Sequence, residues 1–252
     1  MRLLVTTGNT QVPIDRARCI TNVFTGRTGT RIALEAFERG HEVVLITSHP
    51  ELVTALSKSA PKERWDVRHF RGFDDLEKEM EESILQREFD GIIHCAAVSD
   101  YRAGGIYAPT PGTEFRQADG RWTSAASGHP AMVDKSAAKV KSDEPELWLR
   151  LLRTPKLVDR IRRDWRFHGI LVKFKLEVGV DEHQLLEIAE KSRRRSSADM
   201  MVANTLETMS QWAYLGPFDG HYQRIKRQEL SARLIQAVEQ LQDSSDSGEP
   251  GA

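Results

Sequence analysis

Apolar residues recur along this chain at two spacings, which predict an alternation of strands and helices. Residues 3–5 and 41–47 are short, mostly apolar runs, which is typical of strands buried on both faces of a parallel sheet. Between these runs, apolar residues return every three or four positions from Ile32 to Phe37, which is the spacing of one helical face. Gly40 ends this helix, so the start of the chain is predicted to be a βαβ unit.

The same two patterns continue through most of the chain. Further strands are expected at residues 65–70, 90–97, 147–152, 169–178 and 199–204. Helices are expected at residues 74–88, 155–165, 181–196 and 230–241, and WAYLGPFDGHYQRIK is predicted to be a hairpin. The first of these helices should place four apolar residues on one side: Leu76, Met80, Ile84 and Leu85. Repeated strand–helix alternation predicts an α/β fold with a Rossmann-like, doubly wound, mostly parallel sheet.

Two regions lack this periodicity. From residue 102 to about residue 143, Gly, Pro, Ser and Ala dominate and large apolar residues are few. We expect this stretch to be an excursion that contains a flexible flap or a dimerisation arm. Residues 243–252 are rich in Ser, Asp and Gly and are expected to form a disordered tail. The remainder, residues 1–242, is predicted to be a single domain.

Composition narrows the class of protein. The chain has 36 basic and 37 acidic side chains and a formal charge of −1, so its charge does not favour binding to nucleic acid or to an acidic membrane surface. No apolar run is long enough to span a membrane, and the start of the chain is not typical of a signal peptide. Two cysteines, Cys19 and Cys95, form neither a disulfide framework nor a metal-binding spacing. We therefore expect a cytoplasmic protein with reduced thiols.

The loop after the first strand is the first candidate for chemistry. It contains roughly twenty mostly polar residues, where such a connection usually needs a few. Backbone amides of Gly8, Gly26 and Gly29 near a helix N-terminus are typical of phosphate binding, and Arg16, Arg18 and Arg27 are possible anion partners. The G-x-G-x-x-G fingerprint, an acidic end to the second strand and the Gly-Lys-Ser/Thr phosphate loop are all missing. Phosphate recognition is therefore predicted, and nicotinamide chemistry is not supported.

The segment TTGNTQVPIDRARCITNVFTGRTGTRIALEAFERGHEVVLIT resembles the start of phosphopantothenate–cysteine ligases, also called phosphopantothenoylcysteine synthetases. In that family T-x-G-G-T-x-x-P-[IL]-D leads to an Arg, an Asn and S-S-G-[KR]-x-G. Later segments resemble the family's other landmarks in the same order: DGIIHCAAVSDYR, AKVKS, LRLLRTPKLV, VKFKLE and ADMMVANTLE. The resemblance covers residues 3 to about 207.

The resemblance implies an amide ligation in coenzyme A biosynthesis by a ligase domain without the decarboxylase domain that precedes it in many bacterial relatives. ATP or CTP activates the carboxylate of 4′-phosphopantothenate as an acyl-nucleotide, with Mg²⁺ and release of pyrophosphate. The cysteine amine then displaces the nucleotide. The resemblance also implies a homodimer, and hand-over of the product to a separate decarboxylase.

The resemblance also implies roles for individual residues. Asn22 would hold the pantothenate moiety and the acyl intermediate, Arg18 lies close to it in the motif, and Lys139 would assist transfer to cysteine, so these three are the candidate catalytic residues. Substrate binding would also involve Ala96 and Ala97. Nucleotide binding would involve Gly8, Gly26, Gly29, Asp100, Lys139, Pro155, Lys156, Leu157, Val158, Phe174 and Lys191. No residue is expected to be a metal ligand.

Several positions depart from the family pattern. Asn9 replaces the second Gly of the G-G-T turn, and Phe24 and Thr25 stand where two serines are common. The Gly before Phe174 is replaced by Lys173. The cytidine-nucleotide-using enzymes have lysines at the positions of Ser192 and Ser196, whereas the ATP-using members lack them and have a lysine at the position of Lys191. This pattern favours ATP.

Two other classes of function remain open. A short-chain nicotinamide-dependent reductase would need a Tyr-x-x-x-Lys pair and the glycine fingerprint, and neither is convincing in this chain. A non-catalytic nucleotide-binding module is the other alternative, and the altered positions Phe24 and Lys173 keep it open.

Overall fold

A computed structural model describes residues 1–57, 64–125 and 128–246, which belong to two compact units. The first, here called the core unit, comprises Met1–Thr10, Val23–Val98 and Lys156–Ala252. The second, here called the arm unit, comprises Gln11–Asn22 and Ser99–Pro155. The chain therefore leaves the core unit twice, once inside the first loop and once after the strand that ends before Cys95.

Within the described residues, the core unit contains an eight-stranded sheet with the order β15-β14-β13-β12-β6-β1-β4-β5. The strands are β1 (Arg2–Thr7), β4 (Glu42–Thr47), β5 (Trp65–His69), β6 (Gly91–His94), β12 (Ile170–Glu177), β13 (Met200–Thr205), β14 (Trp212–Phe218) and β15 (His221–Lys226). The six strands from β5 to β13 are parallel and follow the Rossmann order, whereas β14 and β15 pair antiparallel at one edge. This arrangement confirms the predicted doubly wound α/β fold.

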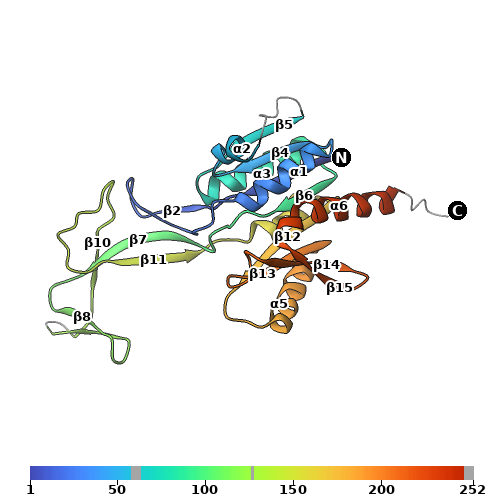
Figure 1. The fold of residues 1–252 in the computed structure, drawn as a ribbon. Coiled ribbons are helices and arrows are strands. Elements are labelled where there is room, and N and C mark those ends of the chain that lie inside the picture. Colours follow the sequence, from blue (N-terminus) through green and yellow to red (C-terminus); the bar gives the residue numbers. More distant parts are fainter. Residues whose placement is uncertain (58–63, 126–127, 247–252) are drawn as a thin grey trace. The chain divides into compact units, whose positions relative to one another are not determined.

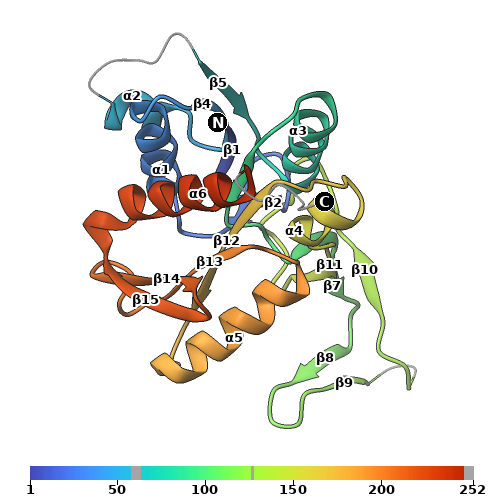
Figure 2. The ribbon, with the colours of Figure 1, turned by 90° about the vertical axis from the view of Figure 1, so that its right-hand side faces the viewer.

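Helices cover both faces of this sheet. They are α1 (Arg27–Glu38), α2 (Glu51–Leu56), α3 (Phe73–Gln86), α4 (Leu157–Arg163), α5 (Glu182–Arg195), the 3₁₀ turn η1 (Arg227–Glu229) and α6 (Leu230–Asp246). Figure 2 shows α1 and α6 side by side, and both pack against Leu3 of β1 and its neighbours. Leu4 of β1 points to the other face, into the cluster that contains residues of α3 and α4. Burial on both faces explains the continuous apolar runs of the central strands.

Two predictions about helices differ from the structure. Leu76 and Met80 of α3 are fully buried, but Leu85 is 63% exposed. Leu85 lies nine positions after Leu76, and at about 100° per residue this places it on roughly the opposite side of the helix. The last helix, α6, continues through Asp246, so residues 243–246 are helical although they were predicted to be tail. No Gly or Pro interrupts the sequence before Gly248. The rest of the predicted tail lies outside the described residues.

The arm unit is built from antiparallel strands. They are β2 (Gln11–Pro13), β3 (Cys19–Thr21), β7 (Tyr101–Pro109), β8 (Thr113–Arg116), β9 (Arg121–Ser124), β10 (Met132–Asp134) and β11 (Trp148–Arg153). Strands β10, β7 and β11 form one sheet, and β2–β3 and β8–β9 form two hairpins. Figure 1 shows β7 and β11 as a long pair drawn in green and yellow. Much of residues 102–143 is therefore regular β-structure, and the strand expected at residues 147–152 belongs to this sheet.

Across the three described ranges, no helix combines the length and the apolar character that crossing a lipid bilayer requires.

Candidate functional site

The carboxyl ends of β1 and β6 lie next to each other at the point where the strand order of the core sheet reverses. The chain moves from β1 to β4 and β5 on one side, and from β6 to β12 and β13 on the other. In open α/β sheets the ligand crevice lies outside the carboxyl ends of the strands at this point. The segments that follow these two strands begin with Gly8 and Cys95.

Three glycines shape the backbone at this position. Gly8 and Gly26 have φ values of 92° and 89°, which L-residues with a Cβ rarely adopt. A Cβ added at Gly26 would lie 2.7 Å from the Cα of Gly8, and one added at Gly29 would lie 2.6 Å from the Cβ of Thr7. Turn formation, close backbone approach and helix–strand packing are the roles of the three glycines in the Rossmann fingerprint. In this chain the three glycines lie farther apart in sequence than in the fingerprint, because the β2–β3 hairpin comes between the first glycine and the second.

The N-terminus of α1 presents backbone donors at this edge. Gly26 is the N-cap of α1 and provides no side-chain cap in the described structure. Its carbonyl is held by the Thr7 hydroxyl at 2.7 Å and by the amide of Thr30 at 3.0 Å. The first amides of the helix have no intrahelical acceptor and lie at the positive end of the helix dipole. The loop and helix therefore form the kind of site that binds phosphate.

Backbone hydrogen bonds continue beyond the ends of the two strands. The Ala97 amide donates to the Gly8 carbonyl at 2.8 Å, and the Thr10 amide donates to the Ala97 carbonyl at 3.2 Å. Asn9 and Ala97 form an isolated parallel bridge. The structure thus brings the expected substrate residues Ala96 and Ala97 next to the expected nucleotide residue Gly8.

The substitution Asn9 has a clear structural role. Its backbone amide donates to the Ser48 hydroxyl at 2.9 Å, and that hydroxyl lies 3.1 Å from the Asn9 Oδ1. The His49 Nε2 is 3.2 Å from the same oxygen. Asn9 therefore connects the end of β1 to the end of β4, which a glycine at this position could not do with a side chain.

Next to this edge, a row of polar residues crosses the buried sheet. Lys173 of β12 lies directly opposite His94 of β6, which in turn lies opposite Thr6 of β1. The Lys173 Nζ donates to the Ser196 Oγ at 3.0 Å and to the Ser192 carbonyl at 3.1 Å. The sequence indicates Lys173 as a substitution, but the contact with the two serines is visible only in the fold.

Burial sets the protonation of this row. Lys173 is 5% exposed, and burial lowers its pKa to about 8. Burial and, to a smaller extent, the charge of Lys173 together lower the pKa of His94 to about 4. At neutral pH His94 is therefore neutral. Its Nδ1 lies 2.9 Å from the Thr6 hydroxyl, which also accepts a hydrogen bond from the Ala96 amide at 3.3 Å. That hydroxyl can donate its proton to Nδ1, which leaves the imidazole proton on Nε2.

Asp15 organises the expected catalytic residues of the arm unit. Its carboxylate accepts from the Arg18 side chain at 2.6 Å and 3.1 Å, from the amides of Ala17 and Arg18 at 2.8 Å each, and from the Val140 amide at 3.1 Å. The bond from the Arg18 guanidinium, followed by these amides, holds the pKa of Asp15 well below its usual range. Asp15 closes the P-[IL]-D part of the motif, but no role was predicted for it from the sequence.

This cluster places Lys139 beside the turn between β2 and β3. The Arg16 amide donates to the Ala138 carbonyl at 3.0 Å, and the Arg18 Nη2 donates to the Val140 carbonyl at 3.0 Å. Lys139 therefore lies on a backbone segment that is anchored on both sides, and its own side chain is exposed. The structure brings Arg18 and Lys139 together, but the Arg18 charge is already paired with Asp15. Asn22 is exposed just after β3 of the same unit.

The other expected nucleotide residues occupy different environments. In the arm unit, Pro155 is exposed, as is Asp100, whose carbonyl accepts from the Thr154 amide at 2.9 Å. In the core unit, Leu157 and Val158 are 2% and 8% exposed and pack in the core, so only their backbone could face a ligand.

The remaining expected residues of the core unit are more accessible. Lys156 is the N-cap of α4, and Phe174 is partly buried against the core on the α1 and α6 face. Lys191 is exposed on α5. Among the described residues, no group of three His, Cys, Asp or Glu side chains is arranged to hold a metal ion.

Comparisons with known proteins agree with this architecture. The family model for the DNA/pantothenate metabolism flavoprotein C-terminal domain matches residues 1–108 and 112–240. The coenzyme A biosynthesis bifunctional protein CoaBC of Thermococcus kodakarensis is 29% identical over 245 residues, which cover 95% of this chain and 51% of that protein. The protein of the same name from Methanocaldococcus jannaschii is 26% identical over 205 residues, which cover 81% of this chain and 40% of that protein. The chain thus spans about half the length, or less, of these curated relatives.

Solved structures of similar proteins show the same fold. The DNA/pantothenate metabolism flavoprotein from Streptococcus pneumoniae is 27% identical, with a TM-score of 0.75 over 96% of this chain and 99% of that chain. A Cab2 mutant in complex with phosphopantothenate-cysteine shares the fold, with a TM-score of 0.65 at 18% identity over 96% of this chain and 86% of that chain. The match of the family model over most of the chain shows that this protein belongs to the family of the DNA/pantothenate metabolism flavoprotein C-terminal domain.

Proposed function

We propose that this chain joins 4′-phosphopantothenate to cysteine in coenzyme A biosynthesis, through an acyl-nucleotide intermediate. The observation that carries this proposal is the arrangement of Gly8, Gly26 and Gly29 around the N-terminus of α1, at the reversal point of the sheet. Family membership supports it, as do relatives named for coenzyme A biosynthesis and a structural neighbour in complex with phosphopantothenate-cysteine.

The chemistry has two steps. In the first, a carboxylate oxygen of 4′-phosphopantothenate attacks the α-phosphorus of the nucleotide; a new O–P bond forms, and the bond to pyrophosphate breaks. In the second, the cysteine amine attacks the acyl carbon; a C–N bond forms, the C–O bond to the nucleotide breaks, and the amine loses a proton. The first step brings two anions together, so donors such as the α1 amides are what it needs.

In this proposal the residues of the arm unit act on the acyl group and on the second step. The exposed ammonium of Lys139 neutralises the charge that develops on the departing nucleotide. The Asn22 amide binds the acyl intermediate. Arg18 acts through its pairing with Asp15, which anchors the segment that carries Lys139. Mg²⁺ would be bound mainly by the nucleotide phosphates and water, because the described residues offer no cluster of ligands for it.

We propose ATP as the preferred nucleotide and a homodimer as the working assembly. The sequence supports ATP through Ser192, Ser196 and Lys191, as set out above. In the structure the Lys173 ammonium contacts both Ser192 and Ser196. A cation therefore lies close to these two positions of α5, although serines replace the lysines of the cytidine-nucleotide-using enzymes there. A comparison of ATP with CTP must therefore include a Lys173 variant.

The test is pyrophosphate release from 4′-phosphopantothenate and Mg²⁺ with ATP or CTP, followed by amide formation when cysteine is added. Lys139→Gln should still release pyrophosphate but should accumulate the acyl-nucleotide, because only the second step needs the ammonium. Lys78→Gln, which removes an equal charge from a 70% exposed position on α3, is the matched control and should behave like the wild type.

Absence of pyrophosphate with every nucleotide would rule out the ligase. Loss of both steps in Lys139→Gln would contradict the role given to Lys139. Asn22→Asp should weaken the reaction by adding negative charge beside an anionic intermediate. Unchanged turnover in this variant would remove Asn22 from the site.

A further inference from the structure

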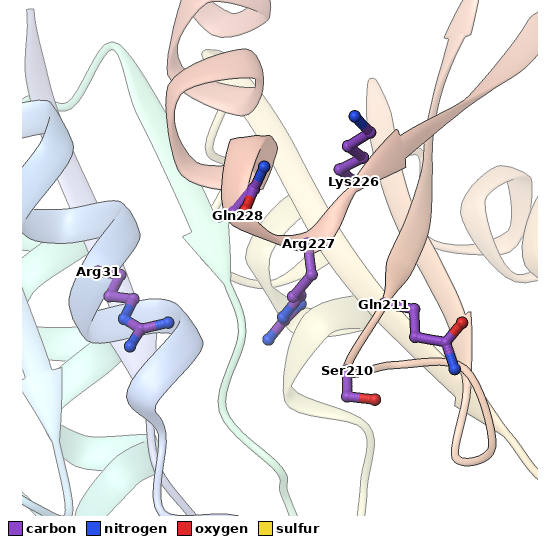
Figure 3. A pocket seen from close by; sticks show the side chains of 6 residues that line it. All are labelled: Arg31, Ser210, Gln211, Lys226, Arg227 and Gln228. Carbon is purple, nitrogen blue, oxygen red and sulfur yellow. The ribbon is translucent and has the colours of Figure 1, made fainter.

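The core unit contains a second feature that neither the sequence motifs nor the glycine loop accounts for. A cavity of about 340 Å³ lies on the α1 and α6 side of the sheet (Figure 3). It is lined by residues from α1, from the turn between β13 and β14, and from the junction of β15 with η1: Arg31, Ser210, Gln211, Lys226, Arg227 and Gln228. Three of these six residues are cations, and none is a carboxylate.

The guanidinium groups of Arg31 and Arg227 are the main evidence that this cavity binds a ligand. Figure 3 shows Arg227 extending into the space beside α1 and Arg31 extending from α1 toward it, while Lys226 and Gln228 point to the other side of the ribbon. Burial lowers the pKa of Arg227, and the like charge of Arg31 contributes in the same direction. In the described part of the chain, no carboxylate forms an ion pair with either arginine. Two like charges brought together in this way favour an anion between them.

Arg227 is held in place by the loop that is already implicated in phosphate binding. Its Nη2 donates to the hydroxyl of Thr28, in the first turn of α1 between Gly26 and Gly29. The guanidinium is planar and offers five donors, so one bond to Thr28 leaves others for a ligand. The cavity therefore adjoins the N-terminal turn of α1, whose first backbone amides have no intrahelical acceptor.

We propose that Arg31 and Arg227 form a binding site for a phosphate-bearing anion, of the class of pyrophosphate or the oligophosphate chain of a nucleotide. Arginine binds phosphate oxygens in a bidentate manner, and two arginines can bind the oxygens of adjacent phosphate groups. Ser210 and Gln211, which are neutral, also line the cavity. The assignment to the nucleotide rests on the proposed ligase function, whereas the binding of pyrophosphate does not.

The test is calorimetric titration of the full chain with inorganic pyrophosphate, without nucleotide or 4′-phosphopantothenate. Arg31→Gln is the cleanest variant, because Arg31 is exposed and no described residue forms an ion pair with it. It should weaken binding about tenfold, the usual scale for one charge-assisted bond. Arg227→Lys keeps the charge but loses the planar fork, and it should also weaken binding. Arg233→Gln removes a charge from an exposed position of α6 outside the cavity, and it should bind like the wild type.

The outcomes separate this proposal from the ligase proposal. If the wild type does not bind pyrophosphate, or if Arg31→Gln and Arg227→Lys bind it as tightly as the wild type, Arg227 only connects η1 to α1 and the proposed anion site is wrong. Melting curves must show that each variant is folded before its affinity is compared. A chain that binds pyrophosphate through the arginines but releases none from any nucleotide would retain this site and lose the ligase function.

Discussion

The core unit and the arm unit bury very different kinds of side chain. The central strands of the core unit carry aliphatic residues that are fully buried on both faces, such as Leu4 and Ile92. Among the described residues of the arm unit, the buried apolar side chains are Val12, Ile106, Ala108 and Val140. The arm unit relies instead on the Asp15 carboxylate and on a cluster of the aromatic rings of Phe115, Trp122 and Trp148, whose centroids are 4.7–5.2 Å apart.

This difference matters because the expected catalytic residues Asn22 and Lys139 lie on the unit with the smaller apolar core. The segment that carries Lys139 is held by hydrogen bonds to one carboxylate, so it can lose its position without disturbing the sheet that presents the glycine loop. Regions with few buried apolar contacts also open at lower free-energy cost. The comparison therefore predicts that the two units respond differently to the same chemical change.

The largest expected effect is a loss of core packing. Ile92→Ala in β6 removes a side chain that is fully buried, and it should lower the free energy of unfolding by roughly 3–5 kcal/mol. The same deletion at Ile106 in β7 should cost about half as much, because fewer apolar neighbours surround it and the site can relax. Urea denaturation monitored by circular dichroism measures both values.

Hydrogen exchange shows where each change acts. Ile106→Ala should increase exchange only in the arm unit, whereas Ile92→Ala should lower protection throughout the core sheet. Equal costs, together with lost protection in the core sheet of Ile106→Ala, would show that the two units unfold as one and would overturn the comparison.

A smaller effect is expected from the buried charge of Lys173. Its folded pKa, about 8, is lower than its ordinary value of 10.5, so the unfolded state binds more protons between these pH values. The wild type should therefore become more stable as the pH rises from 8 to 10.5. Lys173→Met should raise the free energy of unfolding at pH 7 by about 1–2 kcal/mol, after allowance for screening by nearby water, and the gain should vanish near pH 10.5.

His94 gives a second readout of the same substitution. Its folded pKa of about 4 lies below the ordinary 6.5, so its contribution to stability is complete above pH 6.5 and is lost as the pH falls through 4. Lys173→Met removes the nearby charge and should reduce this acid-induced loss. Lys175→Met, at a 33% exposed neighbour that pairs with Glu177, is the control; its charge is only a minor cause of the lowered pKa of Lys173, so it should change both profiles far less. An unchanged or lower stability of Lys173→Met at pH 7 would mean that its two hydrogen bonds outweigh the cost of burial.

The same contrast explains what could be predicted from sequence. The parallel strands of the core unit were found because burial on both faces requires uninterrupted apolar runs such as VVLI. The strand at residues 147–152, which is β11 of the arm unit, was also predicted from its apolar run. The other strands of the arm unit escaped because most of their residues are exposed or only partly buried, and YRAGGIYAP carries no alternation that marks one face. The motif indicated Arg18 and Lys139, but only the fold shows that Asp15 joins their segments. The cavity with Arg31 and Arg227 has no sequence signal, because α1 and η1 are nearly two hundred residues apart.

The smallest and most local effect should come from Asp15→Asn. Asp15 Oδ1 accepts from the amides of Ala17 and Arg18, whereas Oδ2 accepts from the Arg18 side chain and the Val140 amide. An asparagine that keeps its oxygen toward the turn must place its NH₂ group against donors of Arg18 and Val140. The segment that carries Lys139 should then separate from the β2–β3 turn, while the core sheet is unaffected.

Amide exchange at Val140 measures this release directly, because that amide donates to the carboxylate. Exchange should be faster in Asp15→Asn at neutral pH but unchanged in Asp134→Asn, which removes another arm carboxylate that accepts from the Ser136 amide at 2.7 Å. Because the folded pKa of Asp15 is depressed, the wild type should lose the same protection only as the pH falls below the ordinary value of 3.8. If the ligase proposal holds, Asp15→Asn should slow transfer to cysteine more than pyrophosphate release. Undiminished protection at Val140 would mean that the Asp15 carboxylate does not position Lys139.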